Sequence, residues 1–65
     1  MSSMAIVART TSNGLAYLAR SGGRLDWASA EAEADTFLSV REATRTALTL
    51  PGRLRAFALP IRPMA

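Results

Sequence analysis

Four carboxylates in the middle of this chain are the residues whose types and spacing could do chemistry: Asp26, Glu31, Glu33 and Asp35. No basic residue lies between them. The remaining charges are eight arginines against one acid, Glu42, a sum of +7 (eight minus one), whereas the whole chain carries +3 at neutral pH. Charge sorted in this way favours a protein that presents an acidic surface beside basic ones. We therefore expect a binding module.

Catalysis by these acids is disfavoured. Histidine, cysteine and lysine are all absent, and they supply most general bases and nucleophiles near neutral pH. Asp26 with Glu31 or Glu33 remains a conceivable acid–base pair, but 65 residues leave little room for a substrate pocket. The spacing also lacks the Asp-x-Asp-x-Asp-Gly loop of calcium sites. We expect no enzyme, no metal and no cofactor.

Carboxylates held on one surface can instead imitate nucleic-acid phosphates and occupy an arginine-lined groove that normally takes DNA. A solvated loop is the alternative. Trp27 and Arg24 adjoin the acids, and tryptophan and arginine are the residue types most enriched at interface hot spots. Trp27 could also be the principal core ring, and we expect a core position with an exposed edge. The predicted partner is a larger protein or a protein–nucleic acid complex.

A second hypothesis is nucleic-acid binding through arginine. Arg53, Arg55 and Phe57 would share one face of a strand and offer two phosphate contacts and a stacking ring. Alternatively, Phe57 lies in the core and the two arginines discourage aggregation at a sheet edge. No helix-turn-helix, zinc-finger or aromatic RNA-binding signature appears. DNA or RNA binding is therefore the competing interpretation.

The elements that must position these residues begin with a hairpin. Met4–Arg9 is β-branched at its centre, Asn13-Gly14 is a tight-turn signal, and Leu15–Arg20 follows as the second strand. Ser21-Gly-Gly23 turns the chain again, and Arg24–Trp27 predicts a short third strand. Alternation places Leu15, Tyr17 and Ala19 on one face of the second strand and Ala16, Leu18 and Arg20 on the other.

The acidic stretch fits two geometries. Alanine alternates with acid from Ala30 to Asp35, which as a strand would gather Glu31, Glu33 and Asp35 on one face and as a helix would spread them. The stretch is barely two turns long, and isolated helices this short are marginal. We interpret residues 28–35 as a loop with a possible helical turn, followed by a brief extended segment, Asp35–Leu38, that buries Phe37.

A capping box gives the clearest local signal. The hydroxyl of Ser39 can accept from the third helical N–H while Glu42 reaches back, so a helix over about residues 39–50 is predicted. Pro51-Gly52 would end it, with the glycine supplying a left-handed exit. The apolar side of this helix would carry Val40, Ala43, Ala47 and Leu50 at helical spacing, with Leu48 beside them.

A last strand, Arg53–Leu59, would return onto the sheet, and Pro60 and Pro63 would stop further pairing. The expected fold is a single α+β domain over 1–65, an antiparallel sheet of three or four strands packed against the helix. Because the chain is short and has no cysteine that could form a disulfide bond, a packed core or self-association must stabilise it. We expect a monomer or a weak homodimer.

The early apolar run, Met4–Ala8, is far shorter than the roughly 18 residues that a membrane span needs. Positive charge follows that run instead of preceding it, unlike a secretory signal. We therefore expect no membrane association and a cytoplasmic location.

The chain resembles small bacterial and phage proteins in which a hairpin bearing Tyr-Leu leads through a tryptophan loop to a helix start. The match covers roughly Leu15–Leu50 and rests on Tyr17-Leu18-Ala19-Arg20, Gly23, Trp27, Ala34, Phe37, Ser39 and Glu42-Ala43. This resemblance implies a β-β-(β)-α-β scaffold. Accessory proteins of phages and mobile elements, among them anti-CRISPR proteins, are similar in size and style. The resemblance therefore implies an inhibitor whose partner is a CRISPR effector.

Overall fold

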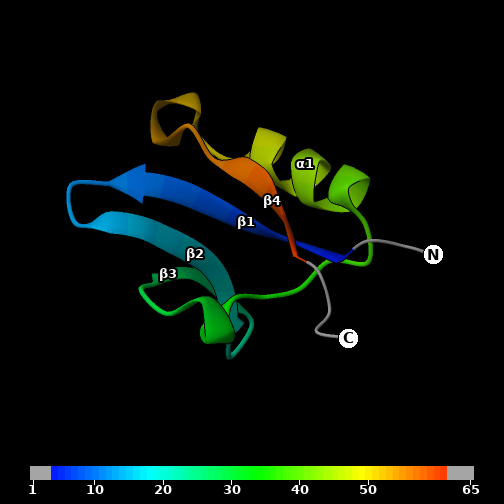
Figure 1. Cartoon of the computed structure of the whole chain (residues 1–65), viewed down its shortest axis with the longest axis horizontal. Coiled ribbons are helices and arrows are strands. Elements are labelled where there is room, and N and C mark those ends of the chain that lie inside the picture. The colour runs from blue at the N-terminus through cyan, green and yellow to red at the C-terminus, as the bar shows by residue number, and fades with distance from the viewer. Residues whose placement is uncertain (1–3, 62–65) are drawn as a thin grey trace.

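A four-stranded antiparallel sheet with one α-helix against one face makes up the structure, a computed structural model that describes residues 4–61 (Figure 1). The strand order is β3-β2-β1-β4, so the last strand pairs beside the first. The predicted α+β class is confirmed. In chain order the elements are β1 (Met4–Thr11), β2 (Gly14–Ser21), β3 (Arg24–Ala28), the 3₁₀ turn η1 (Glu31–Glu33), α1 (Val40–Thr49), the 3₁₀ turn η2 (Gly52–Leu54) and β4 (Phe57–Ile61).

Both predicted hairpins are present. The first turns through Ser12 and Asn13, so that Gly14, with φ 115°, already pairs with Thr11 as the first residue of β2. The Thr11 hydroxyl braces this turn, because it donates to the Gly14 carbonyl (2.8 Å) and accepts from the Asn13 N–H (3.2 Å). The second hairpin turns through Gly22 and Gly23, whose φ values of 57° and 80° suit glycine in a two-residue turn.

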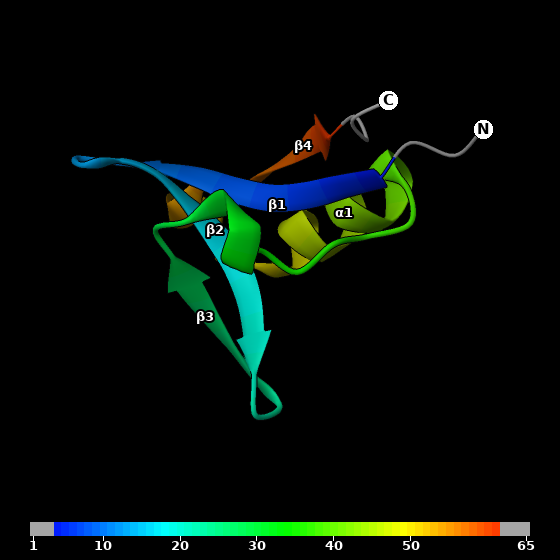
Figure 2. The same cartoon turned by 60° about the horizontal axis from the view of Figure 1, so that its bottom comes forward.

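Beyond Tyr17, β2 diverges from β1, and the β2–β3 hairpin swings away from the rest of the sheet (Figure 2). The segment after η1 fills the gap. The Asp35 N–H donates to the Leu18 carbonyl (2.9 Å), and Phe37 exchanges two backbone hydrogen bonds with Ala5 (3.1 and 2.7 Å). Phe37 is half-buried against the core, as predicted for this extended segment. The loop that carries the acids is thereby tied to two strands.

The helix begins where the capping box predicts. Ser39 is extended, with φ −152° and ψ 159°, and its hydroxyl accepts from the Glu42 N–H (3.2 Å). Ala43 and Ala47 face the sheet and are buried. The expectation for Val40 and Leu48 is wrong, because Val40 is exposed and Leu48 is 80% exposed. Each helical residue turns by about 100°, so Leu48 points away from the side that Ala47 buries.

Replacing Ser39 with alanine tests this helix start. We expect Ser39→Ala to lower the free energy of unfolding by about 1 kcal/mol, because the N–H of Glu42 loses its side-chain acceptor. Urea denaturation of Ser39→Ala and Ser39→Asp would measure it, since aspartate can accept the same hydrogen bond. Equal losses in both variants would show that the cap is not the source of the stability.

The chain after the helix departs from the prediction. Residues 52–54 form η2, held by hydrogen bonds from the Leu54 N–H to Pro51 (3.0 Å) and from the Arg55 N–H to Gly52 (3.1 Å). The left-handed residue is Arg55, with φ 52° and ψ 42°, while Gly52 has no positive φ. Strand β4 begins only at Phe57. Arg53, Arg55 and Phe57 therefore do not share a strand face, because the first two precede the strand.

Pro60 lies within β4, opposite Ala5, and does not close the sheet as predicted. Strand β4 is an edge strand, where a residue without an N–H is tolerated. Pro63 lies outside the described residues.

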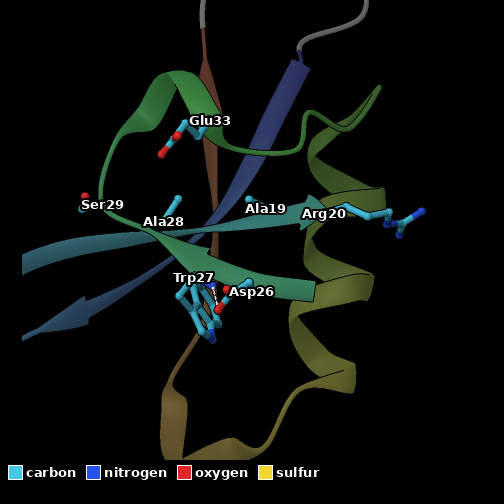
Figure 3. Close-up of a pocket in the computed structure, with 7 residues that line it drawn as sticks. All are labelled: Ala19, Arg20, Asp26, Trp27, Ala28, Ser29 and Glu33. Atoms are coloured by element: carbon cyan, nitrogen blue, oxygen red, sulfur yellow. Dashed lines mark hydrogen bonds between the residues drawn. The ribbon is translucent and has the colours of Figure 1, made fainter. Parts of the chain in front are cut away.

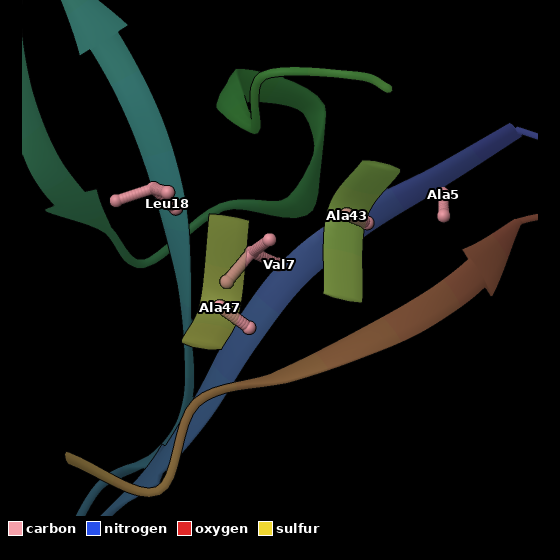
Figure 4. Close-up of a cluster of buried hydrophobic side chains, with 5 residues drawn as sticks. All are labelled: Ala5, Val7, Leu18, Ala43 and Ala47. Atoms are coloured by element: carbon pink, nitrogen blue, oxygen red, sulfur yellow. The ribbon is translucent and has the colours of Figure 1, made fainter. Parts of the chain in front are cut away.

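The core is small and lies between α1 and the sheet (Figure 4). Its buried members are Ala5, Val7, Leu18, Ala43 and Ala47. The half-buried side chains of Trp27, Phe37 and Leu50 pack around it. Within residues 4–61 there is no helix with the length and apolar character that a membrane crossing needs.

Candidate functional site

The acidic stretch borders an open depression at the free edge of β3, with a volume of about 630 Å³ (Figure 3). The depression brings together Asp26 and Trp27 from the strand and Glu33 from η1. These are three of the residues predicted for the partner-binding site. The full lining is Ala19, Arg20, Asp26, Trp27, Ala28, Ser29 and Glu33.

Asp26 is exposed on β3, and its carboxylate is held by the backbone. Oδ1 accepts from the N–H of Trp27 at 2.8 Å. This fixes one oxygen and leaves Oδ2 for a partner. The same contact satisfies a backbone donor of an edge strand, which would otherwise be free to pair with another chain. Asp26 therefore has a structural role as well as a candidate binding role.

Glu31 and Glu33 lie in the single 3₁₀ turn η1, and both side chains are exposed. The turn closes with hydrogen bonds from the Glu33 N–H to Ala30 (3.1 Å) and from the Ala34 N–H to Glu31 (3.0 Å). A loop with one helical turn was the interpretation of this stretch, and it is confirmed. Figure 3 shows Glu33 above Ala19 and Ala28, while Glu31 is in the same turn but does not line the depression.

Asp35 is set apart from the other acids. It is half-buried, and its Oδ2 lies 4.0 Å from Nε of Arg20 on β2. The pair is largely exposed on the arginine side, so it adds little stability. Its effect is on charge, because Arg20 offsets one of the four acids. We define the acidic surface as Asp26, Glu31 and Glu33, with Asp35 at its margin.

Trp27 packs against the core while remaining half-buried, as expected from the sequence. The guanidinium carbon of Arg9, on β1, lies 5.4 Å from the centroid of its ring. This distance is within the range of cation–π attraction. Arg9 was not among the predicted site residues, although it directly follows the apolar run Met4–Ala8 and alternation from Val7 places it on the helix-facing side of the sheet.

The predicted arginines take separate positions. Arg24 is exposed at the start of β3 and does not line the depression. Arg53 is exposed in η2, and Arg55 is exposed at the left-handed residue that ends it. The two residues of the competing hypothesis thus belong to one turn before β4, away from any ladder with a neighbouring strand.

The arrangement suits binding. Two carboxylates, a tryptophan edge and Arg20 line a shallow surface. In the part of the chain that the structure describes, no group of three or more acids, histidines or cysteines could hold a metal ion. Comparison of the chain with protein-family models, with curated proteins and with solved structures found no match in any of the three.

Proposed function

We propose that this chain is a non-enzymatic inhibitor that docks through its acidic surface on a larger protein that handles nucleic acid. The observation that carries the proposal is the placement of Asp26 and Glu33 around one depression with the half-buried Trp27, while Glu31 is exposed in the same turn as Glu33. Asp26 adjoins Trp27 on β3, while Glu33 lies across that strand from the Trp27 ring (Figure 3). Carboxylates and an aromatic anchor therefore line one depression, which is the composition typical of interface hot spots with a polar rim.

The charges are available for such a contact. Glu31 and Glu33 make no salt bridge and no side-chain hydrogen bond with another residue in 4–61. An arginine- or lysine-lined groove can therefore pair with them without first breaking an internal contact. Opposite charges also steer the encounter and raise its rate at low salt. Because three acids are few, Trp27 would supply the apolar part of the contact.

A groove that normally holds nucleic-acid phosphates has the required positive charge, and this supports a partner of that class. Among such partners a CRISPR effector is the first to test, because it is the one that the resemblance implies. The cytoplasm is the compartment in which an inhibitor of this kind would act.

Reversing the charge of the acidic surface tests the proposal. We expect Glu31→Lys with Glu33→Lys to weaken binding to a CRISPR surveillance complex at least about a hundredfold, because each acid would meet like charge in a basic groove. The free energy of unfolding should change by less than about 0.5 kcal/mol, because both side chains are exposed and make no salt bridge within residues 4–61. The measurement is competition with fluorescent duplex DNA for the complex.

A matched control is available in the fifth acid. Glu42 is also exposed but lies on α1. Glu42→Lys and Glu33→Lys change the net charge equally, so only Glu33→Lys should reduce binding if position matters more than total charge. Unchanged inhibition by the double variant would contradict the proposal and leave η1 as a solvated loop.

The same titration decides the competing hypothesis. If the protein alone binds DNA, and if the double variant Arg53→Ala with Arg55→Ala binds more weakly and with a smaller salt dependence, a nucleic-acid-binding module is favoured. Both arginines are exposed, so their side chains are accessible to a nucleic acid.

A further inference from the structure

The helix-facing side of the β2–β3 hairpin carries a surface that the acidic stretch does not use. Helix α1 packs on β1 and β4, and the hairpin diverges from it (Figure 2). Leu18 on β2 faces the core, and its ladder partner on β3 is Trp27. Leu25 and Trp27 therefore lie on the helix-facing side of β3, because residues two apart on a strand share a face. We define the arginine–tryptophan surface as Arg9, Arg20, Leu25 and Trp27.

Arg9 belongs to β1 and reaches Trp27 across β2. In the β1–β2 ladder Arg9 stands opposite Ala16, whose single methyl group leaves room for the arginine side chain to cross the strand. The guanidinium carbon then lies 5.4 Å from the centroid of the Trp27 ring, within the range of cation–π attraction. Both side chains are half-buried, and the ring packs against the core. The arginine and the tryptophan therefore stabilise each other at the boundary between core and solvent.

The guanidinium of Arg9 has hydrogen-bonding capacity that the described chain does not use. Its Nε is buried, and no atom within residues 4–61 accepts a hydrogen bond from it. The whole guanidinium makes no salt bridge and no hydrogen bond in that range. Because Nε is the only buried nitrogen of this group without a partner, the terminal nitrogens reach solvent. They are free to donate to a carboxylate from outside the chain.

We propose that the arginine–tryptophan surface binds a segment of a partner protein that carries a carboxylate beside a large apolar side chain. Charge is the first argument. Both charged residues of this surface are arginines, and Asp35 lies 4.0 Å from Arg20 but leaves Arg9 without an anion. A carboxylate on the partner would complete a charge-assisted hydrogen bond with Arg9. Arginine and tryptophan are also the residue types most enriched at interface hot spots.

The exposed leucine of this surface is the second argument. Leu25 is 49% exposed and lies two residues from Trp27 on the same side of β3, about 7 Å along the strand. An aliphatic side chain gains from contact with another apolar group and offers nothing to a phosphate. A bound segment in extended conformation would therefore carry its carboxylate and its apolar side chain within about three residues of each other.

A nucleic acid fits this surface less well than a peptide does. Arg9 already occupies one face of the Trp27 ring, where a base would stack. Asp26 and Glu33 line the depression at the same edge of the sheet, and they would repel the continuous phosphates of a strand. A peptide with one carboxylate can avoid them. The proposal goes beyond the acidic surface, because it uses the opposite side of β3 and a partner group of opposite charge.

Selection from a random peptide library displayed on phage, with the full chain immobilised, tests the proposal. We expect the enriched peptides to carry aspartate or glutamate within about three residues of a large apolar residue. A synthetic copy of an enriched peptide that lacks tryptophan is then titrated into the protein in solution. Trp27 is the only tryptophan of the chain, so its fluorescence reports binding at this surface. Replacing the acid of the peptide with its amide should weaken binding at least about tenfold.

Variants of the protein locate the contact. Arg9→Gln should weaken binding of that peptide at least about tenfold, because glutamine has no charge and no forked set of donors. The matched control is Arg41→Gln on α1, an exposed position where the same charge is removed and binding should equal that of the wild type. Should Arg9→Gln fail to fold, Leu25→Ala takes its place and should weaken binding at least about threefold through loss of apolar contact.

The proposal is overturned if no peptide is enriched, if the enriched peptides are rich in lysine or arginine, or if Arg9→Gln binds as the wild type does. Single-stranded DNA that binds in an Arg9-dependent manner where no peptide does would also overturn it and assign the surface to nucleic acid. Basic peptides whose binding is lost in Glu31→Lys with Glu33→Lys would support the acidic surface alone. Binding of an acidic peptide should survive that double variant, so either proposal can fail without the other.

Discussion

Leu18→Ala is expected to lower the free energy of unfolding by about 2 to 5 kcal/mol. Leu18 is 1% exposed and is one of the few large side chains that the core buries completely. It lies on β2 among Val7, Ala43 and Trp27. Truncation would remove apolar contact and leave a cavity that alanine neighbours cannot fill. A domain of this length has roughly 3 to 10 kcal/mol of total stability, so the variant should be partly unfolded at 37 °C.

The matched control makes the same chemical change on the exposed side of the helix. Leu48 is 80% exposed, so Leu48→Ala should change the free energy of unfolding by less than about 0.5 kcal/mol. Urea denaturation followed by Trp27 fluorescence measures both variants. A Leu18→Ala protein as stable as the wild type would mean that the Leu18 side chain is not packed in the core as described, whatever Leu48→Ala does.

Alternation and capping signals predicted most of the fold because they act locally. Residues two apart on a strand share a face, which correctly separated Leu18 in the core from Tyr17 on the other side of the sheet. The Ser39–Glu42 spacing located the helix start, because it depends on one side-chain hydrogen bond. The strand order could not be predicted from such signals, since a short strand at the C-terminus pairs equally well with either edge of a hairpin.

The errors lie where local rules compete. Residues 53–59 carry an imperfect alternation, and a 3₁₀ turn with two backbone hydrogen bonds replaced the predicted start of the strand. Leu48 was assigned inward because it neighbours buried positions, although a step of one residue on a helix changes the face. Only the first error traces to a backbone dihedral, the left-handed conformation of Arg55, which the residue types alone do not determine.

The candidate site was predicted as a linear cluster, and the structure distributes it in space. Asp26 and Glu33 line one depression, while Asp35 lies beside Arg20, which precedes the acidic stretch by several residues. Acidic and basic residues are therefore less separated on the surface of the protein than they are along its sequence. The pairing of β2 with β3 brings Arg20 near the acids, and that pairing is a property of the hairpin, not of the acidic segment.

Ala43→Leu is expected to cost about 1 to 3 kcal/mol of stability, the second large effect. Ala43 is completely buried where α1 packs on β1, close to Ala5. Three of the five members of the core cluster within residues 4–61 are alanines, Ala5, Ala43 and Ala47, so the helix can approach the sheet closely. Three added carbon atoms would push the helix away from the strand and disturb the packing of its other contacts. Thr44→Leu, at the next and exposed position, is the matched control.

This prediction distinguishes alanines that are required for close packing of the helix on the sheet from alanines that have no such role. About half the chain is apolar, at 49%, yet buried alanine contributes little transfer free energy because its side chain is a single methyl group. If the alanines are required for close approach, Ala43→Leu should lower the midpoint of urea denaturation while Thr44→Leu leaves it nearly unchanged. If Ala43→Leu instead raises the midpoint, the helix does not lie tightly on β1, and the core has room for a larger side chain. The small core of this chain would then be loosely packed.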